Sequence, residues 1–357
     1  MLEGEPDRVP LWELTVQRDV KSAFLGRRIN TMEDEIEFWT TAGYEHVPLS
    51  VGLRTIVREQ YRYLQTGGVS TAVRKRMPGH LMKAKYSVFT DELQERQWAE
   101  EKKGVIATKE DFESFPWPTA EELDYSPLEN ASGYLPQGMK AIAIVGYAFT
   151  PVWTLMGFET FAYALAENPG LVERMFEKVG SLTYEIVKIA STFPSVGAIM
   201  MPDDLAYSHS LMIAPRHFRK YLFPWYKRIS TDICKPKNLP YVFHSDGKLD
   251  AVMDDLVDCG FNAIHPFEPK CMDLAENKKK YGHKICLLGN IDLHYTLTLG
   301  TPQEVEEETK LRIKQAAPGG GFACGSANSV TEYVPLANYN AMRETVLKYG
   351  TYPINIP

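Results

Sequence analysis

Short apolar runs alternate along the chain with amphipathic stretches. The apolar residues stand at consecutive positions rather than in strict alternation, which is typical of parallel strands buried on both faces. The predicted strands are RVPLWEL (8–14), HVPLSV (46–51), AIAIVGY (141–147), AIMMP (198–202), YVFHS (241–245), AIHPF (263–267), ICLLGN (285–290) and GFACG (321–325).

The segments between these runs carry the signals of helices. Thr301 stands as an N-cap before Pro302, and Glu304 follows three residues after the cap, which predicts a capped helix start. Glycines close several of the amphipathic stretches, as helix ends favour. The predicted helices cover 157–191 (two helices divided near Pro169), 214–234 (kinked at Pro224), 247–260, 301–316 and 338–350.

Repeated strand-then-helix units predict a parallel sheet that closes on itself, so the predicted fold is an α/β TIM barrel formed by 1–357 as a single domain. The gap between the second and third strands, 52–140, is too long for a loop. It contains a helical stretch at 55–65 and a hairpin-like region at 85–118. We interpret 52–140 as an insertion that caps the barrel or lies at a subunit contact. Its aromatic residues argue against a disordered linker.

The composition narrows the possible partners and the compartment. The net charge is -7 and the pI about 5.7, which argues against nucleic acid or an anionic membrane as a partner. No apolar run reaches the roughly 18 residues of a membrane span. The N-terminus, MLEGEPDRVP, reads as neither a signal nor a transit peptide, so a cytoplasmic location is expected. The 5 cysteines form no CxxC pair and predict free thiols rather than a disulfide framework.

Polar side chains follow most of the predicted strands, where a TIM barrel carries its active site. A helix cap explains any one of them, Asp246 for example, but not the whole set. The strand-end residues are Glu13; Tyr147 and Thr150; Asp203 and Asp204; His244, Ser245 and Asp246; His265 and Glu268; Asn290 and Asp292; Cys324 and Asn328.

Three of these side chains, His244, Asp246 and Cys324, offer the three donor types that zinc accepts. A catalytic zinc uses three protein ligands and keeps one position open. The H-x-D spacing places both side chains on the same side of an extended segment. The alternative is a hydrogen-bonded rim histidine with a core cysteine.

Two further features have open readings. For Asp203 and Asp204 three interpretations are open: the pair binds a cation, one of the two acts in proton transfer, or both are solvated acids in a loop. The glycine-rich APGGGFACGSANS (317–329) precedes a strand and lacks a phosphate-loop pattern, so a tight turn is favoured.

Longer stretches resemble one family. EGEPDRVPLWE, TLMGFETFAYALAENPGLVERM, MPDDLAYSHSLMIAPRHFRKYLFPWYKRI, YVFHSDGKLDAVMDDLVDCGFNAIHPFEP, LLGNIDLHYTLTLGTPQEVEEE and PGGGFACGSANSV together resemble the uroporphyrinogen decarboxylase superfamily, whose fold is a TIM barrel. The decarboxylases themselves use no cofactor and carry an arginine-rich N-terminal motif. Arg8 and Arg18 do not reproduce that motif, so a polyacidic tetrapyrrole would lack charge-assisted partners here.

The other branch of the superfamily contains cobamide-dependent methyltransferases, whose zinc site resembles H-x-C on the fifth strand plus a cysteine on the eighth. His244 and Cys324 match two positions, and Asp246 replaces a cysteine. The resemblance implies Zn²⁺, a corrinoid on a separate partner protein, and a homodimer. A carboxylate in place of a thiolate makes the metal harder and favours an oxygen leaving group. The resemblance therefore implies an O-demethylase methyltransferase acting on a small methoxylated, preferably aromatic, substrate.

In that hypothesis Asp204 and Asp246 are the catalytic carboxylates. The candidate substrate-binding residues are Glu13, Tyr147, Trp153, Met200, Asp203, Phe267 and Asn290. Two alternatives stay open: metal-free decarboxylation of a carboxylated substrate, with Asp204 or Glu13 steering protonation, and a non-enzymatic barrel that binds a ligand or partner. Whether the protein binds zinc distinguishes the methyl-transfer hypothesis from metal-free decarboxylation.

Overall fold

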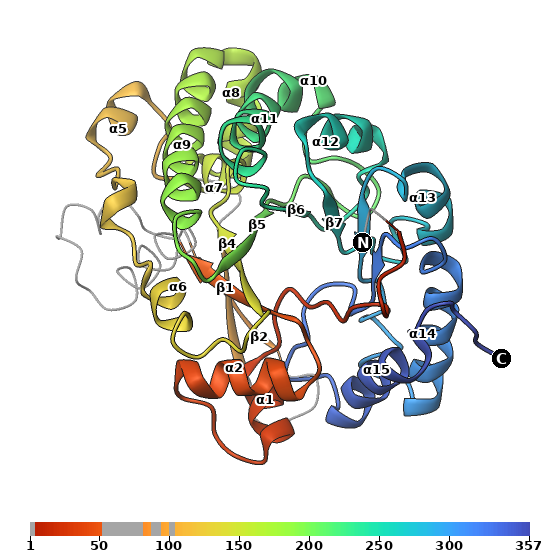
Figure 1. Cartoon of the computed structure of the whole chain (residues 1–357). Coiled ribbons are helices and arrows are strands. Elements are labelled where there is room, and N and C mark those ends of the chain that lie inside the picture. The colour runs from red at the N-terminus through yellow and green to blue at the C-terminus, as the bar shows by residue number, and fades with distance from the viewer. Residues whose placement is uncertain (1–3, 52–80, 87–93, 100–103) are drawn as a thin grey trace.

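The computed structural model describes residues 4–51, 81–86, 94–99 and 104–357. A curled sheet of 7 parallel strands runs in the order β1–β4–β5–β6–β7–β8–β9, with helices around its outer side (Figure 1). Seven of the predicted strands are confirmed. They are β1 (His46–Val51), β4 (Lys140–Val145), β5 (Val196–Pro202), β6 (Tyr241–His244), β7 (Ala263–His265), β8 (Cys286–Leu288) and β9 (Phe322–Ala323).

The remaining predicted strand, 8–14, does not form. Leu11 makes one isolated parallel bridge with Cys324, and the Trp12 N–H donates to the Cys324 carbonyl at 2.9 Å. β9 is only 2 residues long, and Pro10 has no N–H to extend a ladder. The expected closed eight-stranded barrel is therefore found as a seven-stranded curled sheet with the N-terminal segment beside β9.

Helices follow the strands at the predicted places. Asn168 caps α9 and divides it from α8, and Thr301 and Glu304 form the expected capping box of α14. A π-helical turn, η2 (Phe218–Leu222), precedes Pro224, where a kink was predicted. The helices are α1 (Arg18–Leu25), α2 (Met32–Thr41), α5 (Lys109–Ser114), α6 (Ser126–Ala131), α7 (Thr150–Met156), α8 (Phe158–Glu167), α9 (Pro169–Ala190), α10 (Pro215–His217), α11 (Phe223–Ile229), α12 (Met253–Cys259), α13 (Leu274–Tyr281), α14 (Pro302–Ala316) and α15 (Leu336–Tyr349), with short turns η1 (Ala120–Glu122), η3 (Ser230–Cys234) and η4 (Asp250–Val252).

The segment between β1 and β4 contains an antiparallel pair, β2 (Leu81–Tyr86) and β3 (Gln94–Ala99), followed by α5, η1 and α6. An antiparallel strand pair therefore lies in this region, but over 81–86 and 94–99 rather than 85–118, and Lys109–Ser114 within the predicted range is helical. The helical stretch predicted at 55–65 lies outside the described residues. The single-domain assignment and the role of the insertion stay predictions.

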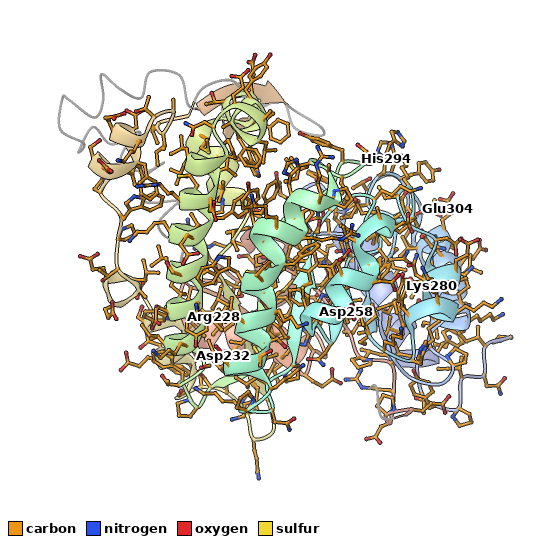
Figure 2. All side chains as sticks on the ribbon, turned by 90° about the horizontal axis from the view of Figure 1, so that it is seen from above. Arg228, Asp232, Asp258, Lys280, His294 and Glu304 are labelled. Carbon is orange, nitrogen blue, oxygen red and sulfur yellow. The ribbon has the colours of Figure 1, made fainter. Side chains whose placement is uncertain are left out.

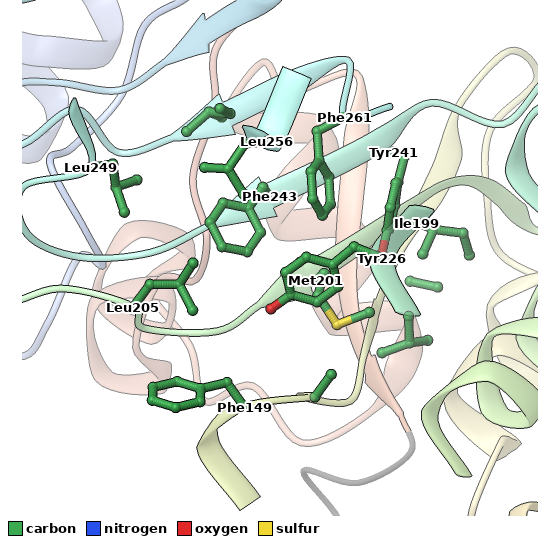
Figure 3. Close-up of a cluster of buried hydrophobic side chains, with 14 of the residues drawn as sticks. Phe149, Ile199, Met201, Leu205, Tyr226, Tyr241, Phe243, Leu249, Leu256 and Phe261 are labelled. Atoms are coloured by element: carbon green, nitrogen blue, oxygen red, sulfur yellow. The ribbon is translucent and has the colours of Figure 1, made fainter. Parts of the chain in front are cut away.

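The two faces of the strands bury different sets of side chains. Ile144, Met200 and Val242 point to the inner side of the curl, where they form a small apolar cluster. Their chain neighbours join the larger core between sheet and helices. Figure 3 shows part of that outer core, with Tyr226 among Met201, Phe243 and Phe261. Successive residues of a strand point to opposite faces of the sheet, so alternate side chains belong to the inner cluster and to the outer core.

Charged side chains cover the outer helices. Arg228 and Asp232 lie near one end of the molecule and His294 near the other (Figure 2). The Arg228–Asp232 pair, at 3.6 Å, is half exposed and contributes little to stability. Among the described residues, no helix is both long enough and apolar enough to cross a bilayer.

Candidate metal centre at the carboxyl ends of the strands

Three side chains converge where β5 and β6 end: Asp204, His244 and Asp246, here called the donor cluster. The Nε2 atom of His244 lies 3.6 Å from Oδ1 of Asp246 and 3.9 Å from Oδ1 of Asp204. His244 pairs with Pro202 in the sheet, which brings the residues after β5 alongside β6. His244 and Asp246 share a side because alternate residues of an extended segment do so.

Hydrogen bonds hold the two carboxylates of the donor cluster. The backbone N–H of Asp246 donates to Asp204 at 3.0 Å, and the Asn328 amide lies 2.7 and 2.8 Å from the two Asp246 oxygens. The next N–H, of Gly247, donates to Glu268 at 2.7 Å. Gly247 has φ +85°, and a Cβ there would lie 2.6 Å from two backbone carbonyl oxygens, so the loop requires glycine.

The cluster is electrostatically poised for a cation. Partial burial, followed by the negative charges of Asp204 and Glu268, raises the pKa of Asp246 to about 8. A bound cation would remove this repulsion, because it favours the ionised form of each carboxylate.

Behind the cluster lies a second histidine. His244 and His265 are register partners on β6 and β7, and their Nδ1 atoms are 2.8 Å apart. The Nε2 atom of His265 lies 3.4 Å from the Ser326 carbonyl oxygen. Burial, followed by the neighbouring His244, lowers the pKa of His265 well below its usual range, so its ring is neutral.

Glu13 is connected to the donor cluster through Ser326 and His265. Its carboxyl group accepts from the Ser326 N–H at 2.8 Å and from the Ser326 hydroxyl. The side chain is fully buried, and desolvation raises the pKa of Glu13 to about 8 against the opposing effect of the Ser326 bonds. Glu13 therefore anchors a strand end and does not contact the donor cluster.

The donor cluster fits a small cation such as zinc. Zinc bonds to imidazole and carboxylate are about 2.0–2.2 Å long, so tetrahedral donors lie roughly 3.3–3.6 Å apart. The observed distances of 3.6 and 3.9 Å from His244 approach that spacing, and all three donor atoms lie within 4.8 Å of one another. The donor set is one nitrogen and two carboxylates, and hard oxygen donors dominate it.

A pocket of about 940 Å³ adjoins the cluster. Asn328 and Glu268, which hold the cluster's loop, are part of its wall. Lys270 is the one lysine or arginine among its described lining residues. The pocket, here called the mouth pocket, is lined by Thr15, Gln17, Ser208, Glu268, Pro269, Lys270, Cys271, Asp292, Leu293, His294, Thr298, Leu299, Ala327, Asn328, Ser329, Thr331 and Tyr333.

Comparison with known families gives a match to the uroporphyrinogen decarboxylase (URO-D) family over residues 103–349. The chain belongs to this family. The resemblance of the sequence to the superfamily is thereby confirmed.

Curated proteins that the chain resembles are named as methyltransferases. The chain is 32% identical over 156 residues to methylcobamide:CoM methyltransferase MtaA of Methanosarcina barkeri, covering 42% of this chain and 44% of that protein. It is 24% identical over 201 residues to a methylated-thiol–coenzyme M methyltransferase of Methanosarcina mazei, covering 56% and 51%. The chain thus spans about half the length of the curated relatives it matches.

A solved methyltransferase from Methanosarcina mazei shares the fold. The superposition has a TM-score of 0.64 at 18% identity and covers 98% of this chain and 96% of that one. The fold of that methyltransferase therefore extends over nearly the whole of this chain.

The structure does not bring Cys324 to the donor cluster, so its assignment as a metal ligand is corrected. Ala323 points to the inner cluster, and Cys324, the next residue, points to the outer core and is fully buried. Burial raises the pKa of the Cys324 thiol far above its usual range. Asp204 takes the third place instead.

Asp203 also differs from its predicted role in substrate binding. Its carboxylate is fully buried and accepts from three backbone N–H groups at the start of α7, from the Thr150 hydroxyl and from the Tyr226 hydroxyl. These donors occupy both oxygens. Asp203 therefore joins β5 to α7 and α11 and leaves no oxygen for a substrate.

The other predicted substrate residues do not line the mouth pocket. Met200 belongs to the inner apolar cluster, and Phe267 is buried with its carbonyl accepting from the Asn290 amide at 2.7 Å. Tyr147 follows β4, and its carbonyl accepts from Thr183. Trp153 packs edge-on against Phe158. Their substrate-binding roles stay predictions.

No site role was predicted from the sequence for Ser326, Asn328, Glu268 or His265. The last three were among the strand-end polar residues, so position alone could have marked them. Ser326 acts through its backbone carbonyl and its contact with Glu13. Nothing in its residue type signals that function.

Proposed function

We propose that this protein is a zinc-dependent methyltransferase that moves a methyl group from a methoxylated compound to a corrinoid on a separate protein. The observation that carries the proposal is the donor cluster beside the mouth pocket. The cobamide-dependent methyltransferases among its relatives support it.

The chain's own residues would hold the zinc through His244 and the carboxylates of Asp204 and Asp246. When bound, the ion acts as a Lewis acid toward an oxygen atom. Asn328 holds the Asp246 carboxylate in place, and Glu268 fixes the loop that follows it. In this arrangement Asp246 is a metal ligand, as predicted, and Asp204, which was predicted only as a catalytic carboxylate, is a metal ligand as well.

The donor set favours an ether as methyl source. Two carboxylates and one imidazole make a harder site than thiolates would, and hard metals favour oxygen. The overall reaction balances as ether plus cob(I)alamin plus a proton giving an alcohol plus methylcob(III)alamin. A bound corrinoid would supply the nucleophile, and the residues at the carboxyl ends of the strands would orient the substrate.

The mouth pocket indicates a polar substrate. Lys270 is positioned to meet an anionic substituent, and Gln17 and Thr298 offer hydrogen bonds. A methoxybenzoate combines an aryl methyl ether with one carboxylate and is the substrate class to test first. The corrinoid protein, the homodimer and the cytoplasmic location remain predictions.

Decarboxylation of a polyacidic substrate receives less support. Asp204, Asp246 and Glu268 place three carboxyl groups at this mouth, and like charges would repel such a substrate. A decarboxylase reading would need cationic side chains here. Among the described lining residues, Lys270 alone has a permanent positive charge.

The test has two parts. Elemental mass spectrometry should find about one zinc per chain in the wild type, lost in His244→Ala and Asp246→Ala and kept in the matched control Cys324→Ser. Methoxybenzoates with cob(I)alamin should then give the absorbance of methylcob(III)alamin. A folded wild type that takes up no metal, or that releases carbon dioxide from a carboxylated substrate without metal, contradicts the proposal.

A further inference from the structure

Two buried histidines face each other through the same ring atom. The Nδ1 atoms of His244 and His265 are 2.8 Å apart, and the ring centroids lie 5.0 Å apart at an interplanar angle of 27°. Two nitrogen atoms at this distance share a single proton, because two N–H groups would repel and two lone pairs would not attract. One ring must donate and the other accept.

Ser326 decides which ring donates. A carbonyl oxygen only accepts, so the His265 Nε2 atom, 3.4 Å from the Ser326 oxygen, carries a proton. In a neutral ring the Nδ1 atom of His265 is then the acceptor. His244 consequently donates from Nδ1 and keeps its lone pair on Nε2, the atom that faces Asp204 and Asp246.

The Ser326 carbonyl is itself held in place. Both the N–H and the hydroxyl of Ser326 donate to the buried Glu13. A Cβ on the preceding Gly325 would lie 1.6 Å from the Trp12 carbonyl oxygen, so the backbone there is in close contact with the N-terminal segment. The carbonyl therefore has little freedom to turn away from His265.

We propose that His265, backed by Ser326 and Glu13, is a positioning residue that fixes His244 as the Nδ1–H tautomer and so makes Nε2 its metal-donor atom. The inference rests on the donor cluster of the proposed function but not on methyl transfer. A group that hydrogen-bonds to the far nitrogen of a metal-binding histidine sets the orientation of its ring and its basicity as a ligand. Neutral imidazole in water favours the opposite tautomer, with the proton on Nε2. An Nδ1–H tautomer of His244 is therefore evidence for its contact with His265.

Nitrogen-15 NMR of the histidine-labelled, metal-free full chain tests the proposal directly. Wild-type His244, assigned by its loss in His244→Gln, should show a protonated Nδ1 and a lone pair on Nε2. His265→Phe removes the acceptor at similar volume, and His244 should then change to the Nε2–H tautomer. The zinc affinity, measured by chelator competition, should fall by about 10- to 100-fold.

Two further variants separate positioning from general structure. His265→Asn keeps an acceptor oxygen near the former Nδ1 atom and should restore the tautomer and most of the affinity. The exposed His283→Phe should change neither quantity.

An Nε2–H tautomer in the wild type overturns the proposal, and so does unchanged affinity in folded His265→Phe. The wild-type spectrum decides the question even where a variant fails to fold. Failure of methyl transfer with the tautomer intact would count against the proposed function alone.

Discussion

Asp203 and Asp204 are adjacent in the chain and lie in two different regions of the molecule. Asp203 points between the sheet and its helices, where five donors saturate a fully buried carboxylate. Asp204 points to the mouth of the sheet, where its side chain is 51% exposed and meets His244 and the Asp246 N–H. One carboxylate holds the fold together, and the other is available to a cation.

The hydrogen-bond donors around a strand-end carboxylate, rather than its residue type, therefore determine its role. A buried carboxylate is stable only when hydrogen bonds replace its lost hydration. A carboxylate beside other acids and few donors gains most from a metal ion. The outer core around Tyr226, shown in Figure 3, supplies the first environment, and the mouth supplies the second.

Replacing each of these two aspartates by alanine should produce the largest effects, on stability at Asp203 and on zinc binding at Asp204. Asp203→Ala leaves three backbone N–H groups and two hydroxyls without their acceptor, so the free energy of unfolding should fall by about 3–5 kcal/mol. Asp204→Ala should leave stability within about 0.5 kcal/mol but abolish zinc binding. Urea unfolding of the metal-free proteins and elemental analysis measure the two quantities. Equal stability losses in both variants would contradict the comparison.

The second prediction concerns Glu13, a buried carboxyl group outside both regions. Its folded-state pKa of about 8 exceeds the ordinary value of 4.5, so the folded protein binds the proton more tightly than the unfolded chain. The resulting stabilisation is complete below about pH 4.5 and disappears as the pH rises through 8. Glu13 should therefore lower the free energy of unfolding by about 2 kcal/mol between pH 6 and pH 8.

Glu13→Gln removes this titration and serves as the reference. Urea unfolding of both proteins across this pH range should give a smaller slope for the variant. Identical slopes would mean that Glu13 is ionised in the folded protein at neutral pH, contrary to the effect of its burial.

The smallest effect is expected at Cys324. Cys324→Ala removes one buried sulfur from the outer core, so the loss of stability should be about 1 kcal/mol, with the zinc content unchanged. In the native protein, iodoacetamide should modify the partly exposed Cys271 before Cys324. Loss of zinc from a folded Cys324→Ala variant would mean that Cys324 is a metal ligand after all. It would also contradict the assignment of Cys324 to the outer core.

The order of apolar and polar residues predicts the strands of this protein and the polar residues at their ends. Consecutive apolar residues predicted seven of the strands, and the cap at Thr301 predicted a helix start, because both depend on local backbone chemistry. The H-x-D spacing predicted that His244 and Asp246 share one side, since alternation is intrinsic to an extended chain.

The side that each strand end faces depends on how distant segments of the chain pack together. Alternation gives the period of a strand but not its phase relative to the inner and outer cores, so Cys324 rather than Asp204 was predicted as the third metal ligand. The pairing of β6 with β7 brought His265 to His244, and the N-terminal segment brought Glu13 to Ser326 across more than 300 residues of chain. Such contacts depend on register between distant segments, which local sequence chemistry does not specify.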